Sequence, residues 1–417
     1  MHSETQTVAV IGLGYIGLPT AALLASCGYE VRGVDTNPEV VETINAGKVH
    51  IEEKDLDGLV HKVVTAGSFR AFTQVPAADI FLIAVPTPLD EARNPVLDFV
   101  DSAARAIAPM LQTGNCIVLE STSPVGTTEA VAQTIRDLRP DLTIPSPDCT
   151  GSADIAIAYC PERVLPGKII RELISNDRVI GGITPDCAKV AAKFYRSFVK
   201  GVCLETTART AEMVKLAENS FRDVNIAFAN ELSLIAESLN IDIWEVLRLA
   251  NRHPRVSILK PGPGVGGHCI AVDPWFLVAG APEAARLIRT GREVNTHKST
   301  HVFTTLDRML RTNPEKKAAI LGLAFKPDID DFRESPSLEI TEQLSAHHGE
   351  RLLVVEPFTE HLPPSLFQSG ARLCELDEAV SAADIIAILV DHSAFGGLTR
   401  SMLSDKIVYD TRGMLSQ

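Results

Sequence analysis

One short segment near the N-terminus constrains the fold more than any other part of the chain. The β-rich apolar run at residues 8–11 ends in Gly12, and a helix-compatible stretch follows at residues 18–27. A second strand-like run, residues 30–34, then ends at Asp35. Two strands flanking a helix at this spacing predict a β-α-β unit, which belongs in a parallel sheet covered by helices on both faces.

The turn inside this unit carries the spacing Gly12-x-Gly14-x-x-Gly17. Gly12 permits a tight turn, Gly14 lets a pyrophosphate approach the backbone, and Gly17 lets the helix pack on the strand. The N-terminus of the helix then offers N–H groups and a partial positive charge to phosphates. Asp35 would accept hydrogen bonds from ribose hydroxyls and would repel a 2′-phosphate. The sequence therefore predicts NAD, not NADP, against the alternative of a purely structural turn.

The C-terminal part of the chain reads as a degenerate copy of the N-terminal part. Apolar strands resemble one another, but here three blocks recur in the same order: residues 8–13 with 318–323, 78–85 with 383–390, and 117–122 with 407–411. In the copy, Gly322-Leu323-Ala324-Phe325-Lys326 replaces the glycine fingerprint. A Rossmann-like domain with a lysine in this turn suggests a different phosphate ligand, so a second nucleotide is expected and the substrate is a candidate for it.

The middle of the chain has another character. Residues 206–240 recur at helical spacing with few breakers, a Pro/Gly-rich loop follows at 260–268, and Asn313-Pro314 marks a boundary. We therefore predict an α/β fold in which two Rossmann-like, doubly wound domains are joined by a helical central domain with one long helix. The predicted domains are an NAD-binding domain at 1–203, a central domain at 204–312, and a nucleotide-binding domain at 313–417.

Charge and composition exclude several classes of protein. The formal net charge of the 417 residues is -14, which argues against general binding to nucleic acid or an acidic membrane. No apolar run reaches the ~20 residues that span a bilayer, and the N-terminus shows no signal segment. The eight cysteines are scattered without a C-x-x-C pair, which favours reduced thiols and a cytoplasmic location. We expect no metal site.

The segment Lys260-Pro-Gly-Pro-Gly-Val-Gly-Gly-His-Cys269 is the most informative for chemistry. Its glycines bring backbone N–H groups close to a ligand and deliver one cysteine to the same place. A thiolate can attack an aldehyde, and the thiohemiacetal that results can lose a hydride. A nicotinamide enzyme with a nucleophilic Cys269 would therefore reach the acid level of oxidation. The alternative is that Cys269 is a small packing residue.

Three further sites carry polar groups that suit this chemistry. Lys215 and Asn219 lie four residues apart on the long helix, so both can donate to an oxyanion, although a solvated helix face is the alternative. Glu162 lies between prolines and could position a water for thioester hydrolysis or act as a base. Thr122 follows a strand at the carboxyl edge of the sheet, where ligands of doubly wound sheets bind.

These segments resemble the UDP-glucose/UDP-N-acetylmannosamine dehydrogenase family over nearly the whole chain. The resemblance rests on CPERVLPG from Cys160, KLAENSFRDVNIAFANELS from Lys215, ANRHPRV from Ala250, GPGVGGHCIAVDPWF from Gly262 and GLAFKPDIDDFRESP from Gly322. It implies that Cys269 is the nucleophile and that Lys215 stabilises oxyanions, helped by Asn219, Glu162, Thr122 and Asp273.

The resemblance also implies which residues contact the ligands. The residues expected to contact the UDP-sugar are Arg163, Val164, Lys215, Asn219, Arg222, His253, Arg255, Gly266, Lys326 and Arg412. Beside the three glycines, the residues expected to contact NAD are Tyr15, Ile16, Asp35, Thr87, Thr128 and Arg333. In such enzymes a loop arginine reaches the substrate of the neighbouring subunit. A homodimer is therefore implied, with the long helix as its interface.

Two departures from the UDP-glucose enzymes bear on the substrate. Those enzymes typically carry Phe-Leu after the loop glutamate, where this chain has Arg163-Val164, and a Lys where it has Val272. Both argue against UDP-glucose and favour UDP-N-acetyl-D-mannosamine. Arg163 and Arg222 would suit an N-acetyl carbonyl, although both could instead bind the pyrophosphate. UDP-N-acetylglucosamine and UDP-glucose stay open, because the configuration of one hydroxyl leaves no spacing signature.

The expected reaction is a four-electron oxidation at C6 that uses two NAD and passes through a thiohemiacetal and a thioester on Cys269. The resemblance implies a product for a surface polysaccharide. Two rival interpretations differ in what they require. A two-electron dehydrogenase of a hydroxy acid or sugar phosphate would need no cysteine. A non-catalytic NAD-binding regulator need not keep Lys215, Asn219 and Cys269 together.

Overall fold

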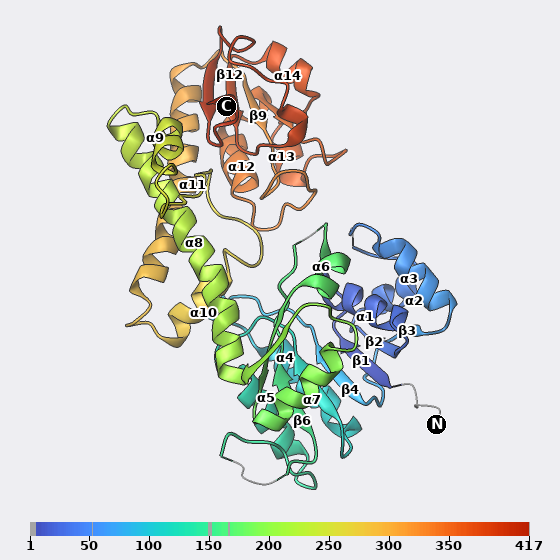
Figure 1. The fold of residues 1–417 in the computed structure, drawn as a ribbon. Coiled ribbons are helices and arrows are strands. Elements are labelled where there is room, and N and C mark those ends of the chain that lie inside the picture. The colour runs from blue at the N-terminus through green and yellow to red at the C-terminus, as the bar shows by residue number, and fades with distance from the viewer. Residues whose placement is uncertain (1–5, 52, 149–151, 166, 417) are drawn as a thin grey trace. The chain divides into compact units, whose positions relative to one another are not determined.

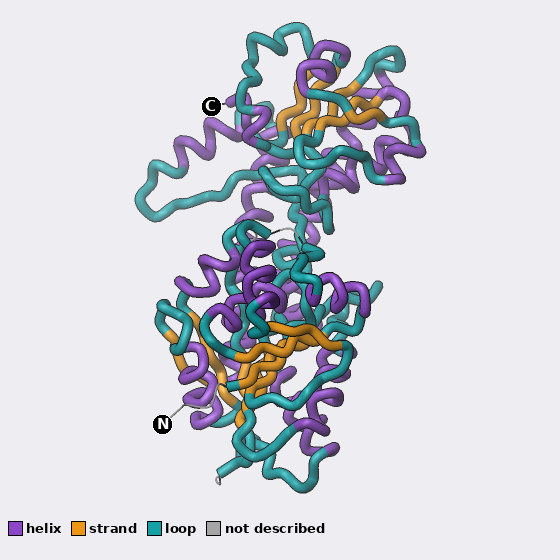
Figure 2. The backbone as a smooth tube through the Cα atoms, turned by 90° about the vertical axis from the view of Figure 1, so that its right-hand side faces the viewer, coloured by secondary structure: helices purple, strands orange, loops and turns teal. Residues whose placement is uncertain are grey.

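The computed structural model describes residues 6–51, 53–148, 152–165 and 167–416. The chain divides into two compact units, Met1–Glu218 and Asn219–Gln417, so the division falls inside the long helix α8 (Ala208–Ser238). The sequence predicts this helix at residues 206–240, and the prediction is confirmed within two residues at each end. Figure 2 shows that the strands of each unit gather into a sheet of their own.

The first unit is built on a sheet of eight described strands in the order β3-β2-β1-β4-β5-β6-β7-β8. Neighbouring strands are parallel except for β6 and β7, which are antiparallel. The central strands are buried apolar runs, as expected for a sheet covered on both faces. Their bounds are β1 Thr7–Ile11, β2 Glu30–Val34, β3 Phe69–Phe72, β4 Ile80–Ile83, β5 Cys116–Leu119, β6 Ala156–Tyr159, β7 Arg178–Gly182 and β8 Cys203–Thr207.

The helices of the first unit connect these strands and cover the sheet (Figure 1). Nine of the ten residues of α1 are buried, because Ala, Leu, Gly and Pro fill the space between sheet and neighbouring helices. Other helices are capped by their own sequence: Asn37 and Thr184 accept from the first turns of α2 and α7. The bounds are α1 Gly17–Ser26, α2 Pro38–Asn45, α3 Leu56–Thr65, α4 Asp98–Ile107, α5 Thr127–Leu138, α6 Ile169–Ser175 and α7 Pro185–Tyr195.

The strand order reverses between β1 and β4, and this reversal places the first site. Ile11, the last residue of β1, pairs with Val34 on one side and with Ile83 on the other. The residues that follow these strands therefore meet at one edge of the sheet. In doubly wound sheets this switch point is where nucleotides bind.

The second unit repeats the same topology in a smaller sheet, β11-β10-β9-β12-β13, with all neighbours parallel. The three recurring sequence blocks form β1 and β9, β4 and β12, and β5 and β13, which hold equivalent places in the two sheets. The predicted α/β fold with two Rossmann-like domains is thus confirmed. The bounds are β9 Ala318–Leu321, β10 Leu352–Val355, β11 Arg372–Leu373, β12 Ile385–Ile388 and β13 Ile407–Asp410.

Helices of the second unit surround this sheet, and one of them, α11, also contacts α8. A buried polar seam joins α8 to α11: Asp223 pairs with Arg292 at 2.7 Å, and Asn230 donates to Asn295 at 2.9 Å. The helix bounds are α9 Ile243–Ala250, α10 Asp273–Gly280, α11 Arg286–Thr312, α12 Pro336–His348, α13 Pro364–Gln368 and α14 Leu376–Ala382. The three-domain bounds 1–203, 204–312 and 313–417 stay a prediction.

Candidate active site

The turn after β1 has the geometry that its three glycines predict. Gly12 has a φ of +92°, and a Cβ there would lie 2.6 Å from the carbonyl oxygen of Ala84. A Cβ on Gly17 would collide with the carbonyl oxygen of Gly12, whereas one on Gly14 would meet no described neighbour within 4 Å. The protein's own packing therefore requires Gly12 and Gly17, and Gly14 leaves an open approach to the backbone. This arrangement fits a dinucleotide phosphate.

Asp35 closes the same site from the end of β2. Its Oδ2 accepts from the backbone N–H of Leu13 at 3.1 Å, and its Oδ1 accepts from Asn37 at 2.9 Å. Both bonds fix the carboxylate beside the glycine turn, where a ribose would lie in the dinucleotide mode of binding. Tyr15 and Ile16 are half-buried in the turn itself.

The threonines predicted to contact ligands lie at the carboxyl edge of the first sheet. Thr87 donates from Oγ1 to the carbonyl of Thr122 at 2.7 Å. Thr128 donates from both its backbone N–H and its hydroxyl to Glu212 of α8, at 2.8 and 2.6 Å, and Gly126 N–H donates to the same carboxylate at 2.6 Å. Glu212 thus satisfies the N-terminus of α5, a role that sequence reasoning missed. Burial raises its pKa, against the hydrogen bonds from Thr128.

Glu162 is held in a buried ion pair. Its Oε2 accepts from Arg178 Nη1 at 2.7 Å, and the two residues are only 7% and 1% exposed. Its Oε1 accepts from the backbone N–H of Arg163 at 2.6 Å. Arg178 also donates to the carbonyl of Leu173 at 3.0 Å and lies over the ring of Tyr195 at 5.6 Å. Both carboxylate oxygens of Glu162 are therefore engaged within the protein.

Lys215 is brought to Glu162, although not to its carboxylate. The buried ammonium donates to the backbone carbonyl of Glu162 at 2.8 Å. The neighbouring Arg163 binds Glu218 of α8 through two nitrogens, at 3.0 and 2.5 Å. Val164 packs against the apolar core of the first unit. The Arg163 guanidinium, predicted to contact substrate, is thus paired with a carboxylate that the sequence did not single out.

In the second unit, Asn219 and Asp273 come together with the segment that carries Cys269. Asn219 donates from Nδ2 to Asp273 Oδ2 at 2.5 Å, and both residues are buried. The carbonyl of Cys269 accepts from the N–H groups of Val272 and Asp273, at 3.0 and 2.8 Å. These bonds fold the chain directly from the cysteine into α10, and they leave the Cys269 side chain half-buried.

The glycine-rich loop before Cys269 packs against elements of the C-terminal Rossmann-like domain. A Cβ on Gly262 would lie 2.5 Å from Arg412 Nη1, and one on Gly267 would lie 2.9 Å from the ring of Phe325. A Cβ on Gly266 would lie 2.6 Å from Pro336. Gly262 N–H also donates to the buried Asn230 at 2.9 Å. The glycines therefore allow close packing, which is a different use from the predicted contact of their N–H groups with a ligand.

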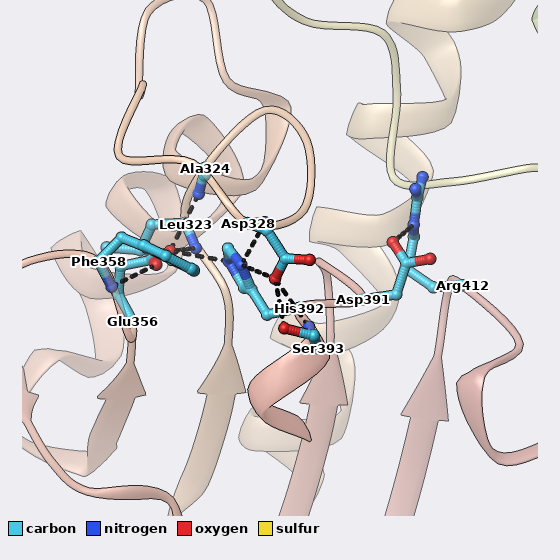
Figure 3. A network of polar contacts seen from close by, with 9 residues as sticks. All are labelled: Leu323, Ala324, Asp328, Glu356, Phe358, Asp391, His392, Ser393 and Arg412. Carbon is cyan, nitrogen blue, oxygen red and sulfur yellow. Dashed lines mark hydrogen bonds and ion pairs between the residues drawn. The ribbon is translucent and has the colours of Figure 1, made fainter. Parts of the chain in front are cut away.

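The carboxyl edge of the second sheet carries a network of charged groups (Figure 3). Arg412 donates from Nε to Asp391 at 2.8 Å, and the Lys326 ammonium lies 5.8 Å from the centre of the Phe325 ring. Arg333, predicted to contact NAD, pairs with Asp331 at 2.6 Å. The remaining residues predicted to contact substrate are exposed, and they are Arg222, His253 and Arg255.

The described residues were also compared with the requirements of a metal site and of a membrane-spanning helix. No group of three or more His, Cys, Asp or Glu side chains in the described part of the chain is arranged to hold a metal ion. Among its helices, none is both long and apolar enough to cross a membrane.

The chain carries a dinucleotide turn, buried lysine and asparagine side chains, and a cysteine loop packed on a second Rossmann-like domain. Together these features are typical of dinucleotide-dependent dehydrogenases. Three family models of UDP-glucose/GDP-mannose dehydrogenases match the chain: the NAD binding domain at residues 6–199, the central domain at 209–297 and the UDP binding domain at 319–417. The chain therefore belongs to the UDP-glucose/GDP-mannose dehydrogenase family.

Named relatives cover almost all of the chain. A UDP-N-acetyl-D-mannosamine dehydrogenase from Escherichia coli strain K12 is 54% identical over 416 residues, which cover 98% of this chain and 99% of the relative. An NDP-N-acetyl-D-galactosaminuronic acid dehydrogenase from Ralstonia nicotianae is 53% identical over 413 residues, or 99% and 97% of the two chains. The solved UDP-N-acetyl-mannosamine dehydrogenase from Staphylococcus aureus superposes with a TM-score of 0.85 at 39% identity, covering 99% of this chain and 96% of that one.

These findings confirm several predictions. The family resemblance is confirmed, the chain is a dehydrogenase with NAD as its cofactor, and its C-terminal domain is of the UDP-binding kind. The interpretation as a non-catalytic regulator is thereby set aside. The roles of the individual site residues, the dimer and the location in the cell stay predictions.

Proposed function

We propose that this UDP-sugar dehydrogenase oxidises the C6 hydroxyl of UDP-N-acetyl-D-mannosamine to a carboxylate, in the cytosol, as a step toward a surface polysaccharide. One observation carries the chemistry. The loop that ends in Cys269 packs through Gly266 and Gly267 on Phe325, next to Lys326 in the domain matched as UDP-binding. A nucleophilic cysteine beside a UDP-sugar site gives the enzyme a way past the aldehyde.

NAD bound at the open turn at Gly14 would supply the hydride acceptor, and the two oxidations would use two NAD molecules in succession. Loss of the first hydride from C6, with the hydroxyl proton passing to solvent, converts the C6 hydroxyl to an aldehyde. The Cys269 thiolate then adds to the aldehyde carbon, and loss of the second hydride from the thiohemiacetal leaves a thioester. Attack by water releases the uronate and regenerates the thiol, with a proton passing to solvent.

Buried polar residues would stabilise the charges that develop in these steps. Lys215 and Asn219 lie one turn apart on α8, and both are buried donors, so they suit an oxyanion at C6. Asp273 holds the Asn219 amide by the bond of 2.5 Å. The Glu162 carboxylate is held in a fixed orientation by Arg178 and by the backbone N–H of Arg163. We therefore assign it the positioning of the hydrolytic water, the first of the two roles predicted for it.

The choice of sugar rests on the relatives. At nearly equal identity, one relative is named for N-acetylmannosamine and one for an N-acetylgalactosaminuronic acid. Both names point to an N-acetylhexosamine, in agreement with the predicted disfavour of UDP-glucose. The solved relative at 39% identity is again named for N-acetylmannosamine, which supports this sugar. UDP-N-acetylgalactosamine is the second candidate that a specific finding favours.

The experiment is a measurement of NADH formation on four substrates: UDP-N-acetylmannosamine, UDP-N-acetylglucosamine, UDP-N-acetylgalactosamine and UDP-glucose. We expect kcat/KM to be at least about tenfold higher for UDP-N-acetylmannosamine than for each of the others, or about 1.4 kcal/mol in transition-state binding. A preference for UDP-N-acetylgalactosamine would move the assignment to the second candidate. A preference for UDP-glucose would refute the N-acetylhexosamine assignment altogether.

We also propose that the enzyme works as a homodimer through α8. Phe221, Phe228 and Ile235 recur every seven residues along this helix and are 69%, 50% and 48% exposed. Such a stripe at heptad spacing is the pattern of a helix that packs on another helix. Arg255, exposed in the segment after α9, suits the predicted contact with the neighbouring subunit's substrate.

A further inference from the structure

His392 lies just beyond β12, at the edge of the second sheet that also carries Arg412 (Figure 3). The side chain is buried, and its ring contacts the rings of Phe358 and Phe395 with centroids 5.2 and 5.3 Å away. Its Nε2 lies 3.3 Å from Oε2 of the buried Glu356. Its Nδ1 accepts a hydrogen bond from the backbone N–H of Asp328 at 3.0 Å.

These two bonds determine the tautomer. A backbone N–H can only donate, so Nδ1 must be the unprotonated nitrogen and Nε2 must carry the hydrogen. The Nε2–H then donates to Glu356. That carboxylate also accepts from the N–H groups of Leu323 and Ala324, at 2.7 and 3.2 Å. Burial alone would raise the pKa of Glu356, but the bonds from His392 and the backbone outweigh it and lower the pKa.

Glu356 occupies the position in the second unit that Asp35 holds in the first. Asp35 accepts from Leu13 after β1, and Glu356 accepts from Leu323 after β9. The longer glutamate reaches farther into its turn, where it binds two N–H groups. The N–H of Ala324, the counterpart of Gly14 in the first unit, is thus satisfied internally. Lys326, which follows in the same turn, has a side chain suited to a phosphate.

The segment that His392 holds is under backbone strain. Asp328 has a φ of +60°, in the left-handed region that non-glycine residues rarely adopt. Besides the bond to His392, its Oδ1 accepts from the N–H and Oγ of Ser393 at 2.8 and 2.9 Å. His392 and Ser393 together therefore clamp the residue in a conformation that the free chain would avoid.

The clamped turn carries the lysine predicted to contact substrate. Phe325 N–H donates to the carbonyl of Asp331 at 3.3 Å, which closes the turn around Lys326. The Phe325 ring packs on Gly267 of the loop that ends in Cys269. A change in the conformation at Asp328, two residues after Lys326, would shift the ammonium and loosen this packing.

We propose that His392 is a positioning residue for substrate binding: by accepting from Asp328 N–H, it fixes the turn that presents Lys326 to the diphosphate of the UDP-sugar. The inference rests on the proposed contact of Lys326 with that substrate. Of the two hydrogen bonds of His392, the one from Asp328 N–H has this effect, and the one to Glu356 does not.

Two near-isosteric substitutions separate the two bonds. In His392→Asn, the side-chain carbonyl takes the place of Nδ1 as acceptor, and the donor to Glu356 is lost. In His392→Gln, the amide takes the place of Nε2–H as donor, and no acceptor remains for Asp328 N–H. Binding of UDP is measured by calorimetry, so the result does not depend on which sugar is turned over. Binding of NAD to the same preparations is the control.

We expect His392→Gln to weaken UDP binding about tenfold, His392→Asn to weaken it less than threefold, and NAD binding to stay unchanged in both. Lys326→Met should weaken UDP binding by ten- to hundredfold. In the Lys326→Met background, His392→Gln should add less than twofold, because both changes remove the same interaction. Equal effects of the two His392 variants, no effect of either, or an undiminished effect in the double variant would overturn the proposal. These UDP affinities do not depend on which sugar is oxidised. A different substrate preference in the sugar panel would therefore overturn the proposed substrate without overturning the role of His392.

Discussion

Glu120 is a buried acid that the predicted roles leave unused. It follows β5, is 3% exposed, and accepts from the Tyr195 hydroxyl at 2.6 Å through Oε1. Its Oε2 has no hydrogen-bond partner among the described residues. Burial, and then the charge of Glu162, raise the pKa of Glu120 from 4.5 to about 7. The folded protein therefore holds a proton here that the unfolded chain releases at lower pH.

This shift predicts how stability depends on pH. Between pH 4.5 and about 7 the folded state binds more protons at Glu120 than the unfolded state, so stability falls as pH rises through this window. The full loss is about 3 kcal/mol, from about 2.5 pH units between the two pKa values. Glu120→Gln should remove this slope, gaining stability relative to wild type at pH 8 but not at pH 4. Urea unfolding at several pH values measures the slope, with Asp98→Asn, a change at an exposed carboxylate that begins α4, as control. Parallel pH profiles of wild type and Glu120→Gln would contradict the shift.

At the residue scale, local patterns were predictable and long-range partners were not. The roles of Gly12 and Gly17 follow from spacing along a single β-α-β unit, and the structure reproduces them. Arg178 and Glu212 hold Glu162 and Thr128, but each lies 16 or more residues away in sequence. A charged residue within a buried strand indicates that it has an oppositely charged or polar partner, but not which residue that partner is. Arg178, the first residue of the wholly buried strand β7, is such a case.

At the scale of elements, the exposed stripe on α8 makes a prediction about assembly. Burying Phe221, Phe228 and Ile235 against a second copy would remove a large apolar area from water, which is what holds a helical dimer together. Phe228→Glu should place charges in that interface and convert the protein from a dimer to a monomer of 45.0 kDa.

Light scattering after size exclusion gives the mass. The matched control is Phe367→Glu, an equally drastic change at a side chain that is 73% exposed on α13, outside the stripe. The control should remain a dimer. Activity of the Phe228→Glu monomer should fall if Arg255 acts across the interface. A wild-type monomer, or a dimer unaffected by Phe228→Glu, would remove α8 as the interface.

The elements themselves followed closely from sequence. The strand at residues 30–34 and the long helix were expected almost at their observed bounds, because apolar periodicity determines them locally. The glycine loop shows what such reasoning leaves out. The contact of its glycines with a ligand stays a prediction, and the structure adds that Gly262 and Gly267 make room for Arg412 and Phe325. Close packing between segments far apart in sequence gives no local pattern.

At the scale of the whole chain, the repeat made the architecture predictable. The same order of blocks in both halves predicted two sheets of one topology, and both show the reversal between their first and fourth strands. The groups named in the proposed oxidation are divided between the two units. The turn of the NAD binding domain belongs to the first, whereas Cys269 and the UDP binding domain belong to the second.

The most direct test is the number of NADH formed per sugar. A limiting amount of UDP-N-acetylmannosamine is converted to completion with excess NAD, and the absorbance of NADH is compared with the product mass. Two NADH per sugar and a uronate product are expected, with turnover lost in Cys269→Ala while UDP and NAD still bind. One NADH per sugar with an aldehyde product, or near-normal turnover in Cys269→Ala, would contradict a thioester on Cys269.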